Sequence, residues 1–233
     1  MTQWVFQPEP NTALAISGSE ALFPVRRVYC VGRNYAEHAK EMGHSGREAP
    51  FFFTKPANSL VQILENREGI IQYPPRTNEL HFEIELVVAL SSGGSNLTVE
   101  QAADAIWGYA VGVDLTRRDL QAQAKEKGRP WDVAKGFDQA APIGQLYPRA
   151  QTGLLEKGSI LLDVNGVRKQ QGDLSQMIWS AAECVAELST YFELKAGDLL
   201  MTGTPAGVGA LQPGDHVMGS IQGLGQLSFR ITD

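Results

Sequence analysis

Short apolar runs bounded by glycine are the feature of this chain that most restricts its possible folds. The sequence contains 24 glycines, which usually fall just before or after short runs rich in Val, Ile, Leu and Phe. This punctuation is typical of many short strands. Only a few segments have the length and periodicity of helices. The pattern therefore predicts an α+β chain that is predominantly β, and it favours a complex β-roll over a doubly wound parallel sheet.

Residues 81–90 carry the most regular alternation in the chain. Side chains on a strand point to opposite faces in turn, so a period of two marks a strand with two different faces. One predicted face is entirely apolar and consists of Phe82, Ile84, Leu86, Val88 and Leu90. The other face consists of His81, Glu83, Glu85, Val87 and Ala89, and so carries two acids. This segment is therefore both a core strand and a candidate site.

The remaining elements follow from apolar periodicity and from turn signals. Asn165-Gly166, between two apolar runs, is the strongest hairpin signal in the chain. We expect a main body over residues 25–233, preceded by a small N-terminal cap over residues 1–24. Strands are predicted at 25–31, 51–56, 109–113, 198–202, 215–222 and 226–231, and helices at 98–106, 116–127 and 175–192.

Composition excludes several classes of protein. The formal charge of −6, with basic residues scattered among acids, argues against a nucleic-acid surface. No apolar run reaches the roughly 20 residues that span a bilayer, and the first residues lack the pattern of a signal peptide. We therefore expect no membrane partner and a cytoplasmic location. Cys30 and Cys184 have no metal-binding spacing and are predicted to be buried free thiols.

Three carboxylates are candidates for a metal site. Glu83 and Glu85 lie two apart on the predicted strand, so both side chains share one face and repel each other unless a cation separates them. Asp114 sits where an apolar strand ends and a helix begins. The alternatives are a solvated outer face for the two glutamates and a helix N-cap for the aspartate. Together the three acids form an all-oxygen set suited to Mg²⁺, Mn²⁺ or Ca²⁺ rather than to zinc.

Cationic and polar residues near these acids are candidates for binding a substrate. Arg118 and Gln121 are three apart near the start of a predicted helix, on one face, where they could hold a substrate carboxylate together. Lys135 lies in a short apolar stretch that favours burial beside an acid. The alternatives are a solvated helix face for the pair and a structural ion pair for the lysine.

Two further motifs complete the candidate site. His38 and Glu41 are three apart in a predicted helical turn, so the carboxylate can orient the imidazole as a general base, although such pairs are often only exposed surface. Residues 202–209 contain Thr204 in a glycine-rich turn that lacks the ending of a phosphate loop. We predict that this turn places backbone amides and threonine hydroxyls against a small ligand.

Six ordered motifs together resemble the fumarylacetoacetate hydrolase family, from about residue 25 to the C-terminus. Within that family the chain is most similar to the short acylpyruvase branch, and its opening residues are similar to those of fumarylpyruvate hydrolases. The matching stretches are VGRNYAEHAKEMG at 31–43, FFFTKP at 51–56, HFEIELVV at 81–88, GYAVGVDLTRRDLQ at 108–121, GRPWDVAKGFD at 128–138 and LLMTGTPAGVG at 199–209.

The resemblance implies the mixed β-roll of this family's C-terminal domain, usually as a homodimer. It implies that Glu83, Glu85 and Asp114 bind one divalent cation, Mg²⁺ or Mn²⁺. It assigns His38 with Glu41 to water activation, and Lys135 to the oxyanion. Arg118, Gln121 and Thr204 would bind the substrate, a dicarboxylic or 2,4-dioxo acid.

The implied reaction is hydrolysis of a carbon–carbon bond in an acylpyruvate, with fumarylpyruvate giving fumarate and pyruvate in aromatic (gentisate) catabolism. Two reactions on the same scaffold are alternatives: decarboxylation of oxaloacetate, and isomerisation or decarboxylation of a dienedioate. A protein that binds metal without catalysis is a third. Phe51, Phe52 and Phe53 are candidates for lining the pocket that selects the acyl group.

Overall fold

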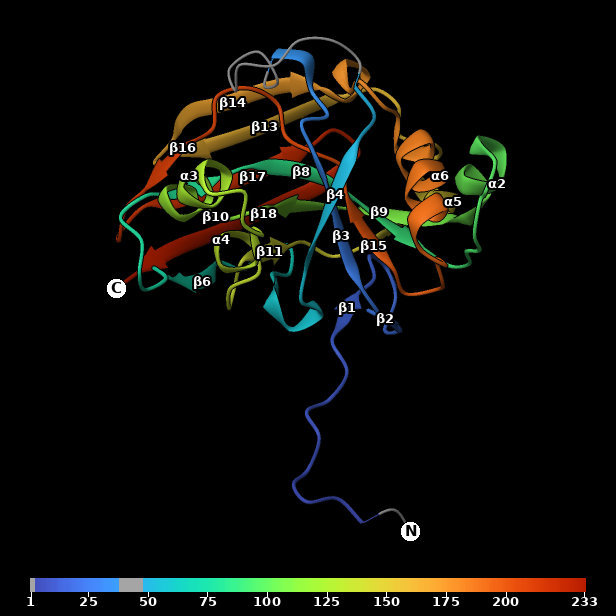
Figure 1. Cartoon of the computed structure of the whole chain (residues 1–233), viewed down its shortest axis with the longest axis horizontal. Helices are drawn as coiled ribbons and strands as arrows, with labels where there is room; N and C mark the ends of the chain where they lie inside the picture. The colour runs from blue at the N-terminus through green and yellow to red at the C-terminus, as the bar shows by residue number, and fades with distance from the viewer. Residues whose placement is uncertain (1–2, 38–47) are drawn as a thin grey trace.

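The computed structural model describes residues 3–37 and 48–233, and its largest unit is an eight-stranded mixed sheet (Figure 1). The sheet contains both antiparallel and parallel strand pairs: β8 and β9 are antiparallel, whereas β15 and β3 are parallel. The strands in spatial order are β4 (Phe51–Lys55), β3 (Val28–Gly32), β15 (Leu199–Met201), β8 (Ile84–Leu90), β9 (Ile106–Val113), β11 (Ala141–Ile143) and β5 (Leu60–Gln62), with β12 (Tyr147–Pro148) also paired to β9.

Three smaller sheets accompany it. The five-stranded sheet has the order β14 (Val167–Asp173), β13 (Ser159–Val164), β17 (His216–Ile221), β18 (Leu224–Thr232) and β6 (Gly69–Gln72). The three-stranded sheet contains β10 (Thr116–Arg117), β7 (Leu80–Phe82) and β16 (Gly209–Leu211), and the hairpin contains β1 (Ala13–Ala15) and β2 (Leu22–Pro24). This arrangement confirms the predicted predominantly β, mixed β-roll.

Both faces of the large sheet are buried, each in its own apolar core. The first core lies between the large sheet and the five-stranded sheet, and it takes Leu86 and Val88 from β8 together with Phe229 from β18. The second core takes Val87 and Ala89 from the opposite face of β8. All five residues of the predicted apolar face belong to the first core, which confirms the period of two. The other face is buried as well, so the solvated outer face considered for the glutamates is wrong.

The helices gather in two places. In Figure 1, α2 (Val99–Ala105), α5 (Arg149–Thr152) and α6 (Ala181–Tyr191) lie on one side of the molecule, whereas α3 (Arg118–Glu126) and α4 (Asp132–Lys135) lie near β10 on the other. Two short 3-10 turns, η1 (Ala57–Ser59) and η2 (Leu174–Gln176), complete the set. None of the helices in the described residues is long and apolar enough to span a bilayer.

The predicted hairpin turn is confirmed, whereas the predicted start of one helix is wrong. Asn165 and Gly166 join β13 to β14 with positive φ values of 52° and 74°, the backbone that an Asn-Gly hairpin turn requires. The helix predicted over 175–192 begins only at Ala181, because η2 ends at Gln176 and Met177 is extended.

The N-terminal hairpin packs on the large sheet. Leu14 of β1 and Phe23 of β2 are buried in the second core, while the described residues before β1 extend away from the body (Figure 1). The role of residues 1–24 as a cap stays a prediction.

Candidate metal centre and active site

The pairing of β8 with β9 brings the three candidate acids together. Glu85 lies on β8, Glu83 lies in the break between β7 and β8, and Asp114 follows β9 directly. Because the two strands are antiparallel, the end of β9 lies beside the start of β8, and Ile84 pairs with Val113. The backbone N–H of Asp114 donates to the carbonyl of Glu83 at 2.8 Å, which fixes the two acids side by side.

The trio is buried and closely spaced. One oxygen from each of Glu83, Glu85 and Asp114 lies within 4.8 Å of the others, and the residues are 5%, 1% and 0% exposed. Gly203 donates its N–H to Glu85 at 2.8 Å; its φ of 94° favours glycine there. Burial, followed by the charges of Asp114 and Glu83, raises the pKa of Glu85 well above its usual range. Like charges this close need a compensating cation.

Two buried lysines compensate part of that charge. Lys135, on α4, donates from Nζ to Glu83 at 2.9 Å and to Asp114 at 2.6 Å. Lys55, at the end of β4, places Nζ 2.8 Å from the other oxygen of Asp114. Burial alone would lower the pKa of Lys135, but Asp114 and Glu83 outweigh it and raise that pKa. Among the described residues, no basic side chain lies within ion-pairing distance of Glu85, so the trio keeps an uncompensated acid that suits a divalent cation.

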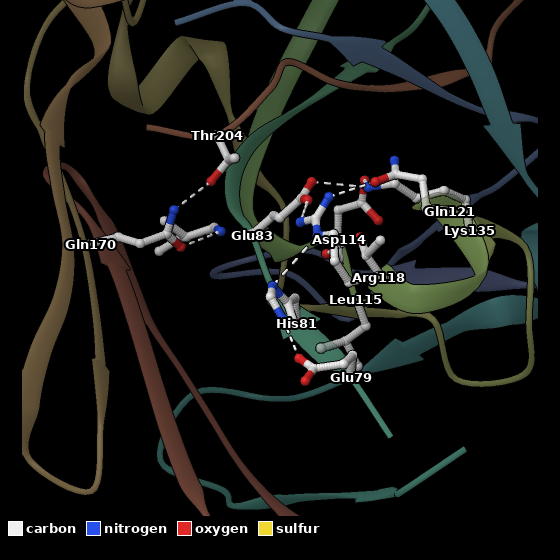
Figure 2. A network of polar contacts seen from close by, with 12 residues as sticks. Glu79, His81, Glu83, Asp114, Leu115, Arg118, Gln121, Lys135, Gln170 and Thr204 are labelled. Carbon is white, nitrogen blue, oxygen red and sulfur yellow. Dashed lines mark hydrogen bonds and ion pairs between the residues drawn. The ribbon is translucent and has the colours of Figure 1, made fainter. Parts of the chain in front are cut away.

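Further hydrogen bonds orient the polar side chains around the trio (Figure 2). Arg118, at the start of α3, donates to Glu83 and, at 2.6 Å, to the side-chain oxygen of Gln121. On the opposite side, Gln170 of β14 donates to the hydroxyl of Thr204 at 2.8 Å. These contacts hold Gln121 and Thr204, both almost fully buried, in fixed positions.

These groups open into one pocket enclosing about 400 Å³ of space, part of it open to solvent. Asp114 lies beneath the pocket floor, whereas both glutamates reach its wall. The residues that line it are Val31, Gly32, Arg33, Phe51, Phe53, Glu83, Glu85, Arg118, Gln121, Lys125, Trp131, Lys135, Gly203 and Thr204. The wall thus combines acids that suit a cation, basic groups that suit an anion, and aromatic rings.

Most of the residues predicted from sequence meet in this pocket. The exceptions are Asp114 and Phe52, which do not line it, and His38 and Glu41, which lie outside the described residues. Lys55 and Gln170 were not predicted. Lys55 had a usable signal, because a lysine that ends a run of phenylalanines just before a proline is as suited to burial beside an acid as Lys135. Gln170 gave no signal, since it lies in a polar hairpin strand.

Comparison with known proteins places the chain in a family. The sequence model of the fumarylacetoacetate (FAA) hydrolase C-terminal family matches residues 27–232. The chain belongs to this family. It is 42% identical to a fumarylpyruvate hydrolase of a Ralstonia species over 184 residues, which are 79% of this chain and 93% of the relative. It is 40% identical to the oxaloacetate tautomerase YcgM of Escherichia coli over 202 residues, 86% of this chain and 90% of the relative.

A solved structure within the family is similar over the whole chain. The fumarylpyruvate hydrolase from Pseudomonas aeruginosa, crystallised in complex with Mn²⁺ and pyruvate, superimposes with a TM-score of 0.97. It shares 52% sequence identity, and the match covers 99% of each chain. The fumarylacetoacetate hydrolase family fold therefore extends over nearly the full length of this protein.

Proposed function

We propose that this family member is a divalent-metal-dependent acylpyruvate hydrolase that converts fumarylpyruvate and water to fumarate and pyruvate. The observation that carries the proposal is the buried trio of acids at a pocket whose other walls are cationic. The relatives from Ralstonia and Pseudomonas aeruginosa support it, because both are fumarylpyruvate hydrolases and the second was solved with Mn²⁺ and pyruvate.

The charges of the site fit a divalent cation and a dianionic substrate. The three acids Glu83, Glu85 and Asp114 would hold one Mg²⁺ or Mn²⁺, for which carboxylate oxygens are suitable ligands. Such an ion supplies Lewis-acid stabilisation of negative charge on substrate oxygens. Lys55, Lys135 and Arg118 balance the acids in number, so the ion would leave two positive charges in excess. This excess positive charge favours an anionic substrate such as fumarylpyruvate, a diacid.

The described side chains would position the pyruvate end of the substrate. Arg118 and Gln121 lie side by side on the pocket wall and would bind the substrate carboxylate, a group that a guanidinium recognises well. Thr204, held by Gln170, would donate its hydroxyl from the opposite wall.

Two further groups would carry the chemistry. His38, oriented by Glu41, would take a proton from water, which attacks the distal carbonyl carbon. Lys135, which reaches the pocket wall, would stabilise the resulting oxyanion; one such donor commonly contributes about 3 kcal/mol. Collapse of the tetrahedral intermediate breaks the carbon–carbon bond, and pyruvate leaves as an enolate that is then protonated.

Oxaloacetate chemistry is a second candidate function, because the Escherichia coli relative is an oxaloacetate tautomerase. Tautomerisation or decarboxylation of oxaloacetate needs the same stabilised enolate but no attacking water. It would use the trio, Arg118 and Lys135 without requiring a general base for water. From the family likeness we also propose a cytoplasmic homodimer that acts in aromatic catabolism.

A turnover panel tests the proposed function. After chelation, the protein is assayed with Mg²⁺ or Mn²⁺ on fumarylpyruvate, acetylpyruvate, fumarylacetoacetate and oxaloacetate, with pyruvate release measured by a coupled dehydrogenase. We expect fumarylpyruvate to be cleaved with the highest kcat/KM. His38→Ala should lower that cleavage by about 10² to 10⁴, as for loss of a general base. His216→Ala, on β17 outside the pocket lining, is the matched control.

The same panel separates the alternatives. Nearly intact fumarylpyruvate cleavage in His38→Ala would contradict the mechanism, and oxaloacetate turnover alone would favour the second candidate. Conversion of a dienedioate without pyruvate release would indicate isomerisation or decarboxylation. Metal-dependent melting without any turnover would indicate a protein that only binds metal.

A further inference from the structure

Two basic residues of the pocket have no part in the mechanism described above. Arg33 follows β3, and Lys125 lies in the last turn of α3; both line the pocket and are only partly exposed. Arg118 and Lys135 each contact an acid of the trio. In contrast, no carboxylate in the described part of the chain lies within ion-pairing distance of Arg33 or Lys125. The pocket therefore has a second cationic region whose charge is available to an anion.

Aromatic rings hold these two cations on the same wall. The guanidinium of Arg33 lies 5.2 Å from the ring centre of Phe51, and Nζ of Lys125 lies 5.2 Å from that of Trp131. The two rings contact each other edge to face, with centres 5.5 Å apart. Cation–ring contacts orient a charge without neutralising it. The wall thus presents two positive groups beside two aromatic rings that meet edge to face.

The pocket places both groups around a common space. Arg33 and Lys125 line the same pocket, over two rings whose centres lie 5.5 Å apart, so both can act on one ligand. The pKa of Lys125 is lowered to about 8, first by burial and then by the charges of Arg118 and Arg33.

This region and the proposed pyruvate end of the pocket lie at opposite ends of helix α3. Arg118 and Lys125 are seven residues apart, which puts them on one helix face about two turns, or roughly 10 Å, apart along the axis. Gln121 lies between them on the same face and also lines the pocket. A ligand that lies along this face would meet one cation at each end, as an elongated diacid requires.

We propose that Arg33 and Lys125 bind the terminal carboxylate of the acyl group, and that they make the enzyme selective for acylpyruvates whose acyl group ends in an anion. Phe51 and Trp131 lie beneath the two cations and pack against the planar, unsaturated part of a fumaryl group. The inference rests on the proposed function and adds to it the chemical class of the acyl group. It requires no covalent step by either residue.

The test compares two substrates that differ at the acyl end. Fumarylpyruvate ends in a carboxylate, whereas acetylpyruvate ends in a methyl group. Arg33→Ala and Lys125→Ala are each assayed on both substrates with Mn²⁺. Each variant should lower kcat/KM for fumarylpyruvate by about 10- to 100-fold, the loss of one charge-assisted hydrogen bond. The loss should fall mainly on KM, because this contact is equally present before and during the reaction.

Matched controls separate recognition from folding. Lys127→Ala removes an exposed lysine two residues after Lys125. Arg76→Ala removes an exposed arginine whose φ of 67° is close to the 59° of Arg33, so it carries the same backbone cost. Both controls should retain full activity on both substrates. Lys125→Arg, which keeps the charge, should recover most of the fumarylpyruvate activity.

The activities of the variants on the two substrates test the role of Arg33 and Lys125 separately from the proposed function. If Arg33→Ala and Lys125→Ala lower the ratio of kcat/KM for fumarylpyruvate to kcat/KM for acetylpyruvate, the proposed role of the two residues is supported. Equal losses on both substrates, or no loss on either, overturn it while the proposed function stands. If the unmodified protein cleaves neither acylpyruvate, the proposed function fails and the inference fails with it.

Discussion

Lys125 is the residue of the pocket whose charge should respond most to alkaline pH. The charged groups that act on it are Arg118, Arg33 and Lys135, which disfavour its proton, and Glu83, which favours it. Its pKa of about 8 is below the ordinary lysine value, so Lys125 loses its proton as the pH rises through that value. The free enzyme then presents one positive charge fewer to the acyl end of a substrate.

We therefore predict that kcat/KM for fumarylpyruvate, relative to that for acetylpyruvate, falls as the pH rises through about 8. Taking the ratio removes pH effects common to both substrates, such as those of the general base. In Lys125→Arg the fall should disappear, because a guanidinium stays protonated over this range. Profiles of kcat/KM against pH for both substrates measure this. An identical fall in the arginine variant would show that another group titrates.

Sequence reasoning found the three acids together with Arg118 and Lys135, but it missed Lys55 and Arg33. The acids could be predicted because the alternation of residues 81–90 places Glu83 and Glu85 on one face. Lys55 was missed because its partner, Asp114, is distant in sequence and follows β9, which three other strands separate from β4 in the sheet. Arg33 gave no signal of its own, since its neighbours in the pocket, Phe51 and Lys125, lie on separate elements.

Hydrogen bonds to Asn34 are the reason why helix α6 is shorter than predicted. The stripe of Met177, Ala181, Val185 and Leu188 continues without a break, and no glycine or proline interrupts residues 175–180. In the structure, the carbonyl of Asn34 accepts from the N–H of Ile178 at 2.7 Å, and its side chain accepts from the N–H of Trp179 at 2.8 Å. A buried residue far away in sequence thus takes backbone donors that a longer helix would use. Periodicity cannot report such a contact.

The helix begins instead at a capping box. Glu183 donates its N–H to the hydroxyl of Ser180 at 3.3 Å, and the side chain of Glu183 accepts from the N–H of Ser180 at 2.8 Å. We predict that Ser180→Ala lowers the free energy of unfolding by about 1 kcal/mol, the usual cost of losing an N-cap. For a chain of this size the melting temperature should fall by about 2–4 °C.

Ser175→Ala is the matched control for this prediction. Ser175 lies at the start of the helix predicted from sequence, and its hydroxyl donates to the partly exposed Asp173. Thermal melting should show a smaller loss for this variant than for Ser180→Ala. The reverse order would mean that the helix begins near residue 175.

For the molecule as a whole, the acid trio is both a candidate metal site and a source of instability. The large sheet is buried on both faces, so β8 cannot turn Glu85 toward solvent without disturbing one of the two cores. Lys135 and Lys55 contact Glu83 and Asp114 but leave Glu85 with a backbone N–H donor. An unpaired buried carboxylate among like charges costs stability, which metal binding to the native state should restore.

We predict from this that Glu85→Gln and the unmodified protein exchange their order of stability when metal is added. In chelator the variant should melt at or above the unmodified protein, because a neutral amide removes the repulsion from Glu83 and Asp114. With Mn²⁺ at about 100 times its Kd, the unmodified protein should gain about 2.7 kcal/mol, and the variant much less because it has lost a charged ligand. Glu126→Gln, an exposed acid on α3, should follow the unmodified protein in both conditions. A variant that melts lower in chelator yet gains the full metal shift would show that Glu85 stabilises the fold without binding the ion.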